Sequence, residues 1–434
     1  MPIARQTQRD SQEKYKMQKA YKILDKYAKM LTMQDYPVGN EAKLYIQTEQ
    51  GVFTTKDNAD LATLTIDDIE KLPSETLPIA SKGYKAMIIS QTPYCQECLR
   101  DMRGLKPSLD DMAQIIGPVA TILDGRIMDG AFYRDLRSTL GRSTGCFILK
   151  GADEDGYAKG YTITAGRTLY EAVVALTVLE KTAEITLLAD KIGGVKHIRP
   201  FESKVMHLVY QQKYSKAEDA AKEEEFKEGI CDTPDSASAA SEAGSKKTNE
   251  QILREKLVEH GKKLVATGLV QGTWGNLSAK LDDTYMLVTP SGLDYMRLTP
   301  SDMVKVNIET LEYEGSLKPT SEKGLHAAVY KQRPDVGSVI HTHSKYCCVF
   351  AAAQQHMPIT EPEDQKIFGK DVRLAGYAIP GSKKLMANSV AALGENFGCI
   401  MSNHGMIACG ADLEAAFDNC VKLEECGKRY LDAL

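Results

Sequence analysis

The sequence predicts a protein of two domains, each with a β-sheet covered by α-helices. Its 434 residues are too many for one typical domain and fit two of about 200 residues each. In both halves, segments with apolar residues at helical spacing alternate with short β-rich stretches between Gly and Pro turns. Such mixed elements with short connections are typical of α/β and α+β folds.

A polar segment separates the two halves. From Ser215 to Glu250 the chain carries a charged run and then Ser, Ala and Gly, with almost no large apolar residue. This composition cannot bury enough surface to offset its ordering entropy, so we expect a flexible linker. The predicted organisation is a first domain at 1–212, a linker at 213–249 and a second domain at 250–434.

The second half shows the predicted elements in order. "NEQILREKLVEHGKKLVATGL" has the periodicity of an opening helix. "TYMLVTP" and "GSVIHTH" have the composition of strands, and "GCIMSNHGMIACG" that of a strand interrupted by a His-Gly turn. "DLEAAFDNCVKLEECGKRYLDAL" has the periodicity of a closing helix. The first half follows the same order.

The two halves also resemble each other in sequence. Four pairs of segments match in one order: Leu64–Leu72 with Leu298–Val306, Tyr84–Cys95 with Val336–Cys347, "GCFI" at Gly145 with "GCIM" at Gly398, and Ile163–Lys181 with Ile407–Glu425. An ordered set of four matches is hard to obtain by chance. The sequence therefore predicts a tandem duplication.

Histidines distinguish the two copies. Six of the eight lie after the linker. In the register of the repeat, His341 and His343 align with Ile89 and Gln91, and His404 aligns where the first half has the insertion "ADEDGYAKG". The joint absence of all three from the first copy is expected if they share one ligand.

Strand geometry supports a shared metal ion. Residues i and i+2 of a strand point to the same face, so His341 and His343 can approach one ion. A lone His-x-His is more often an ordinary polar pair, but His404 supplies a third imidazole, the usual arrangement for catalytic Zn²⁺. Mn²⁺ or Co²⁺ could also occupy such a site.

Three further motifs in the second half have features of anion sites. "QGTWGNLSAK" and "TPSGLDYMRLTP" contain tight turns whose backbone N–H groups can face an anion. "KPTSEKGLHAAVYKQRPD" looks like a helix start, with Thr320 and Ser321 as caps and Glu322 in the first turn. Taken singly, each is more often a structural turn or cap.

Together, "GN-x-S", "TPSG", "KPTSE…LH", "HTH" and "NHG" over residues 250–434 resemble the class II aldolase/adducin family. The resemblance implies a three-layer α/β/α domain around a largely antiparallel sheet. It also implies a homo-oligomer with sites between neighbouring domains. The first half would be a second such domain, degenerate and without metal ligands.

The resemblance assigns roles to residues of the second half. It makes His341, His343 and His404 ligands of a zinc ion. It makes Glu322 the acid/base. The residues that would hold the substrate phosphate are Asn276, Ser291, Gly292, Thr320 and Ser321.

The function implied is that of a zinc-dependent lyase, an aldolase that cleaves or forms a C–C bond in a small phosphorylated ketose through an enediolate. An L-ribulose-5-phosphate 4-epimerase or a ketose-phosphate dehydratase could use the same site. An adducin-like scaffold without activity is a further alternative. The aldolase of the family takes a proton-donating tyrosine from a neighbouring subunit, but the matching stretch "MPITEPEDQ" has none.

Composition restricts the partners. A net charge of -5 gives no electrostatic basis for binding nucleic acid or a membrane surface. No apolar run approaches the roughly 18 residues that span a bilayer, and the N-terminus lacks the apolar core of a signal peptide. Ten cysteines without dense paired spacing suggest reduced thiols. We therefore expect a cytoplasmic protein.

Overall fold

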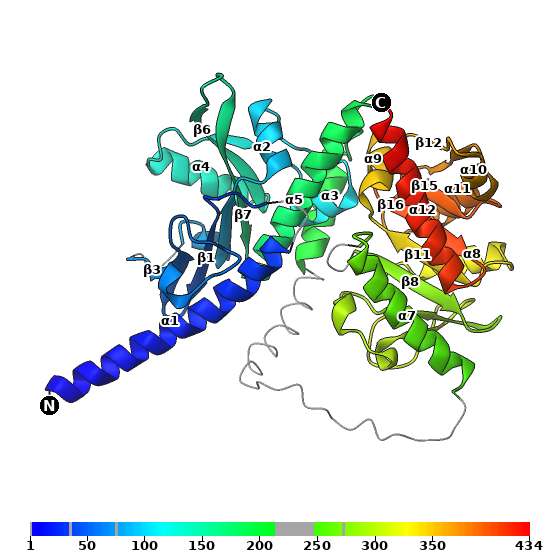
Figure 1. The fold of residues 1–434 in the computed structure, drawn as a ribbon, viewed down its shortest axis with the longest axis horizontal. Helices are drawn as coiled ribbons and strands as arrows, with labels where there is room; N and C mark the ends of the chain where they lie inside the picture. Colours follow the sequence, from blue (N-terminus) through cyan, green and yellow to red (C-terminus); the bar gives the residue numbers. More distant parts are fainter. Residues whose placement is uncertain (1, 34–36, 74–76, 213–246, 271–273) are drawn as a thin grey trace. The chain divides into compact units, whose positions relative to one another are not determined.

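The computed structural model describes residues 2–33, 37–73, 77–212, 247–270 and 274–434. The chain divides into two compact units (Figure 1). Unit 1 consists of Met1–Leu187 and Ile198–His207, and unit 2 of Leu188–His197 and Leu208–Leu434. The predicted linker at 213–249 lies outside the described residues apart from its last three positions.

Unit 1 contains a seven-stranded sheet. In spatial order its strands are β3 (Ile69–Lys71), β2 (Gly51–Thr55), β1 (Lys43–Thr48), β4 (Ala86–Ser90), β7 (Ala158–Gly166), β6 (Gly145–Ala152) and β5 (Ile122–Asp124). Adjacent strands are antiparallel, apart from the parallel pair β5–β6. The helices are α1 (Pro2–Thr32), α2 (Pro93–Arg100), α3 (Asp110–Ile115), α4 (Gly130–Leu140) and α5 (Leu169–Asp190). Residues 200–212 are also helical, and the ends of this segment and of α5, from Leu208 and Leu188 on, belong to unit 2.

Unit 2 contains a second seven-stranded sheet. Its strands, in spatial order, are β10 (Val304–Asn307), β9 (Tyr285–Val288), β8 (Gly275–Lys280), β11 (Ser338–Thr342), β16 (Gly405–Gly410), β15 (Gly398–Met401) and β14 (Leu374–Ala375). All pairs are antiparallel except β14–β15. A separate ribbon pairs β12 (Met357–Pro358) with β13 (Asp371–Val372). The prediction of an α/β domain with a largely antiparallel sheet is confirmed for this half.

Helices cover both faces of the sheet in unit 2. The helices are α7 (Asn249–Ala266), α8 (Lys323–Gln332), α9 (Lys345–Ala353), α10 (Pro362–Phe368), α11 (Lys383–Leu393) and α12 (Leu413–Asp432). α7, α9 and α12 pack on one face, where Figure 1 shows α12 and α7 side by side. α8 and α11 pack together on the other, over a core that includes Val306, Leu325 and Val339. The result is three layers.

The sequence explains why the closing helix docks where it does. Asp412 caps α12 by accepting a hydrogen bond from the backbone of Ala415 at 2.8 Å. Leu413, Cys420 and Leu423 are fully or almost fully buried, and their spacing places them on one stripe of the helix. Each such leucine stabilises the fold by roughly 1.5–3 kcal/mol. Burial of this stripe holds α12 against β16 and β11.

The two sheets have the same strand order and share local details. Ile89 pairs with Ile163 on β7, as His341 pairs with Ile407 on β16. A buried Glu180 accepts hydrogen bonds from the first turn of α2, at 2.8 and 2.9 Å. In unit 2, Glu424 accepts equivalent bonds from the first turn of α9, at 2.7 and 2.9 Å.

Candidate metal centre

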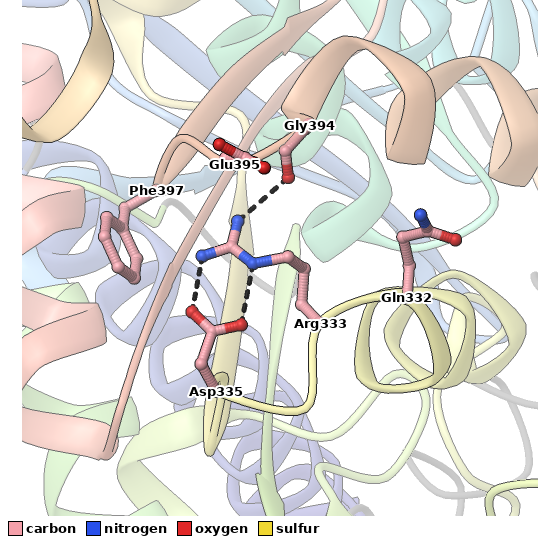
Figure 2. Close-up of a pocket in the computed structure, with 6 residues that line it drawn as sticks. All are labelled: Gln332, Arg333, Asp335, Gly394, Glu395 and Phe397. Carbon is pink, nitrogen blue, oxygen red and sulfur yellow. Dashed lines mark hydrogen bonds and ion pairs between the residues drawn. The ribbon is translucent and has the colours of Figure 1, made fainter.

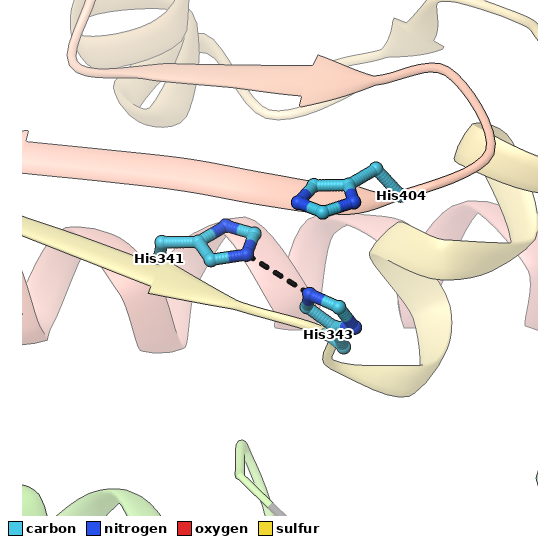
Figure 3. Close-up of side chains that lie close together, drawn as sticks. All are labelled: His341, His343 and His404. Carbon is cyan, nitrogen blue, oxygen red and sulfur yellow. Dashed lines mark hydrogen bonds between the residues drawn. The ribbon is translucent and has the colours of Figure 1, made fainter. Parts of the chain in front are cut away.

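Three predicted metal ligands lie together in unit 2 (Figure 3). His341 is on β11, His343 follows the end of that strand, and His404 is in the turn between β15 and β16. Because β11 pairs with β16, the end of one strand meets the turn that leads into the other. Ligand atoms of the three imidazoles all lie within 4.8 Å of one another.

The orientation of His341 suits metal binding. Its Nδ1 lies 2.8 Å from the carbonyl oxygen of Met406, which accepts a hydrogen bond only, so Nδ1 carries the ring proton. Nε2 therefore presents its lone pair toward Nε2 of His343, 2.9 Å away. Burial lowers the pKa of His341 to about 3, so the ring is neutral at pH 7. A neutral imidazole anchored through its other nitrogen is the usual form of a metal ligand.

Local contacts hold the turn that carries His404. Asn403 has a φ of 57°, a left-handed conformation that asparagine tolerates better than most residues. Its side-chain amide donates to the carbonyl oxygen of Lys196 at 2.7 Å and accepts from Gln354 at 2.6 Å. Its backbone N–H donates to the carbonyl oxygen of Ala351 at 2.9 Å. Three partners thus fix the residue before His404.

Glu322 completes the cluster. Its two carboxylate oxygens lie 3.1 Å from Nε2 of His341 and 3.0 Å from Nε2 of His404. α8 begins at Lys323, so Glu322 caps the helix rather than lying in its first turn, and its side chain makes no capping bond. Burial alone would raise the pKa of Glu322, but its interactions with the adjacent imidazoles of His341 and His404, including the hydrogen bond with His404, lower it well below its usual value.

The residues predicted to hold phosphate are brought to the same place by backbone pairing. Asn276 is the partner of His341 across β8 and β11, and its Nδ2 lies 3.2 Å from Glu322. Thr320 donates its backbone N–H to the carbonyl oxygen of Thr289 at 3.0 Å, which joins the "TPSG" turn to the "KPTSE" segment. Asn276 and Thr320 are buried; the three remaining candidates are more accessible, and they are Ser291, Gly292 and Ser321.

A pocket elsewhere in unit 2 has no catalytic features (Figure 2). Arg333 lies in its wall, and its guanidinium makes four hydrogen bonds within the protein: it donates to both carboxylate oxygens of Asp335 and to the carbonyl oxygens of Gly394 and Asn396. Asp335 precedes β11, whereas the histidines are at the opposite end of that strand. Arg333 therefore ties two loops together rather than binding an anion.

Sequence reasoning gave no role to three buried polar residues next to Asn276. His326, Ser278 and Tyr330 form hydrogen bonds with one another and with the Asn276 side chain. The signal was present in the spacing, because Ser278 is two residues from Asn276 on a strand and Tyr330 is four residues from His326 on a helix.

The donor set fits a divalent metal ion. Three imidazoles and one carboxylate, converging at the end of a buried strand, are ligand types typical of catalytic zinc sites. The fold and this cluster together define an α/β protein with a group of residues that could hold a metal ion. None of the described helices is long and apolar enough to span a membrane.

Comparison with known proteins identifies the family. Residues 255–431 match the profile described as "Class II Aldolase and Adducin N-terminal domain". A 5-methylthioribulose-1-phosphate/5-deoxyribulose-1-phosphate aldolase of Rhodospirillum rubrum is 36% identical over 178 residues, 41% of this chain and 80% of the relative. An L-fuculose phosphate aldolase of Escherichia coli is 32% identical over 182 residues, 42% of this chain and 84% of the relative.

A solved L-fuculose 1-phosphate aldolase is 36% identical and matches 42% of this chain and 86% of its own, with a TM-score of 0.40. The chain belongs to the class II aldolase and adducin family. The sequence matches to the family profile and to the Rhodospirillum rubrum aldolase confirm the predicted family, and with it the expectation of an aldolase-type enzyme.

Proposed function

We propose that unit 2 is a zinc-dependent aldolase that cleaves a small ketose 1-phosphate. The observation that carries this proposal is the convergence of His341, His343 and His404 with Glu322, next to turns whose N–H and hydroxyl groups suit a phosphate. A bound Zn²⁺ would act as a Lewis acid toward the substrate's carbonyl and neighbouring hydroxyl oxygens.

The residues of this chain would perform the remaining steps. Asn276, Thr320 and the "TPSG" turn hold the phosphate through N–H and hydroxyl donors. The C3–C4 bond of the ketose breaks as the C4 hydroxyl loses its proton, and its electrons move toward the C2 carbonyl to give an enediolate. Glu322 is the carboxylate placed to move a proton to or from the reacting carbons. The products are dihydroxyacetone phosphate and an aldehyde.

The relatives suggest which ketoses to test first. Two of them, from Rhodospirillum rubrum and Bacillus thuringiensis, are named as aldolases of 5-deoxyribulose 1-phosphates. Others are named L-fuculose phosphate aldolases. We therefore propose a short-chain ketose 1-phosphate with a small, apolar terminal group, and keep L-fuculose 1-phosphate as the second substrate.

The test is a cleavage assay on the purified full chain with zinc. Release of dihydroxyacetone phosphate from either ketose, lost in His343→Ala, is expected. Epimer formation from L-ribulose 5-phosphate without cleavage would favour the epimerase alternative, and loss of water from the ketose the dehydratase. A chain purified without chelator that holds no divalent ion, and regains none on dialysis against zinc, would favour a scaffold.

We also infer that unit 1 is a degenerate copy of unit 2, produced by tandem duplication. The identical strand order and the equivalent capping carboxylates, Glu180 and Glu424, support this. In unit 1, Lys43 is the strand partner of Ile89; in unit 2, Asn276 is the strand partner of His341. Unit 1 therefore has a lysine at the position where unit 2 has the Asn276 amide.

That lysine forms an ion pair within unit 1. Its partner is Asp57, where the repeat has Ser291 of the "TPSG" turn. A carboxylate therefore stands where the active copy would bind phosphate, and it would repel the substrate. One zinc ion per chain is expected by elemental analysis, whereas two would contradict a metal-free first copy. Light scattering would test the further proposal of a homo-oligomer.

A further inference from the structure

Five buried polar side chains form a continuous chain of hydrogen bonds behind the histidines. They are Glu322, Asn276, His326, Ser278 and Tyr330. Two come from one face of β8 and two from one face of α8, because residues two apart on a strand and four apart on a helix point the same way. The strand face and the helix face meet through these side chains.

The hydrogen-bond partners of these five side chains determine which atom carries each proton. Nδ2 of Asn276 donates to a carboxylate oxygen of Glu322 at 3.2 Å, so Oδ1 of Asn276 faces Nε2 of His326 at 2.5 Å. His326 must then carry its proton on Nε2, and its Nδ1 accepts from the hydroxyl of Ser278 at 2.7 Å. Ser278 in turn accepts from the hydroxyl of Tyr330 at 2.6 Å.

Burial excludes a doubly protonated His326 ring. His326 is fully inaccessible, and burial lowers its pKa to about 4, so the ring is neutral and has a single N–H. No solvent reaches the Asn276 amide from that side to replace the ring as a partner. An unsatisfied amide oxygen there would be costly, since burying a polar atom without a hydrogen bond is unfavourable.

We propose that His326 is a positioning residue that holds the Asn276 amide with its N–H donors facing the substrate site. The proposal rests on the proposed function for the substrate, whose phosphate or enediolate oxygens are negatively charged. An Asn276 amide rotated by 180° would turn its oxygen toward Glu322 and toward those substrate oxygens, and both contacts would be repulsive. The ring N–H of His326 excludes this rotamer because it requires an acceptor.

Full-length variants test the proposal kinetically. His326→Leu removes the donor, whereas His326→Gln keeps an N–H close to the position of Nε2. His260→Leu is the matched control, because His260 is also a buried histidine, on α7, with Nδ1 2.8 Å from the carbonyl oxygen of Lys256. We expect kcat/KM to fall about 10- to 100-fold in His326→Leu, the size expected for one buried hydrogen bond to an oriented group.

The other variants should behave differently. His326→Gln should recover kcat/KM to within about fivefold of the parent, and His260→Leu should leave it unchanged. All should keep their bound zinc. His326→Leu should add no further loss to Asn276→Ala, because the histidine acts through that amide. Additive losses, a Gln variant as poor as the Leu variant, or a fall in melting temperature with unchanged kcat/KM would each overturn the proposal.

A spectroscopic test does not depend on turnover. In protein labelled with ¹⁵N-histidine, the His326 ring should show the Nε2–H tautomer, identified by the signal missing from His326→Gln. The Nδ1–H tautomer would overturn the proposal whatever the activity. If the parent cleaves none of the ketose phosphates but the Nε2–H tautomer is observed, the proposed function fails and the positioning of Asn276 stands.

Discussion

Replacing Asn403 should weaken metal binding without touching a ligand. Asn403→Ala removes two side-chain hydrogen bonds, one to Lys196 and one from Gln354. Each is worth about 1 kcal/mol. It also places a residue with a Cβ and no compensating bond at a φ of 57°, which costs about 1 kcal/mol more. The total, about 3 kcal/mol, falls on the turn that presents His404.

The assay is zinc affinity, measured by competition with a chromophoric chelator on the full chain. Zinc binding must order the turn again, and this costs part of the roughly 3 kcal/mol that the substitution removes. If that part is half or more, the affinity for zinc should fall about 10- to 100-fold, since each 1.4 kcal/mol is a factor of ten. Asn403→Gly is the matched control, because it loses the same two hydrogen bonds but adopts the left-handed conformation freely. It should bind zinc several-fold more tightly than Asn403→Ala.

Two results would refute this reasoning. If Asn403→Gly binds zinc no better than Asn403→Ala, backbone conformation at this position does not matter. If both bind as tightly as the parent, the contacts of Asn403 do not hold His404 in place.

Four further predictions follow from the same residues. Lys196→Pro removes the backbone N–H that donates to the carbonyl oxygen of Ala352 at 2.7 Å, so this variant should bind zinc more weakly. Lys196→Ala keeps that N–H and should bind zinc as the parent does; chelator competition measures both affinities. His343→Ala should abolish stoichiometric zinc binding, and a variant with one tightly bound ion by elemental analysis would contradict the assigned ligand set. Glu322→Gln should lower kcat by about 100-fold or more while zinc remains bound, and an unchanged kcat would exclude it as the acid/base. The metal-free protein should lose stability as pH falls from about 6.5 to 4, because the unfolded chain binds a proton at His326 before the folded one does. His326 should contribute about 3 kcal/mol at most to this loss, so the loss should be smaller in His326→Gln when chemical denaturation is compared at the two pH values.

Sequence patterns were sufficient for the family and the sheet of the second half. The motif "HTH" lies at the end of a β-strand, and strand alternation alone puts its two imidazoles on one side. The periodicity of the closing helix located α12 to within a few residues. These features depend on local geometry, which repeats with a fixed period.

The contacts of individual side chains could not be predicted in the same way. The start of α8 shifted by one residue, so Glu322 became a capping residue whose carboxylate is free to face His341 and His404. The motif also did not reveal that His326 faces Asn276. Both depend on how closely a helix approaches a strand that is distant in sequence.

The sequence by itself determined which residue types were available: three histidines and a carboxylate in the second half of the chain, and no counterparts of these histidines in the first half. It also determined the order of strands and helices, because hydrophobic periodicity and turn residues act over a few positions. Tertiary structure decided which groups meet. The separation between His404 and Glu322 is 82 positions along the chain but 3.0 Å in space. The pairing of β11 with β16 and the packing of α8 on the sheet bring these two residues together. The hydrophobic effect that drives this packing depends on the apolar surface area removed from water, and not on how close two residues are in sequence.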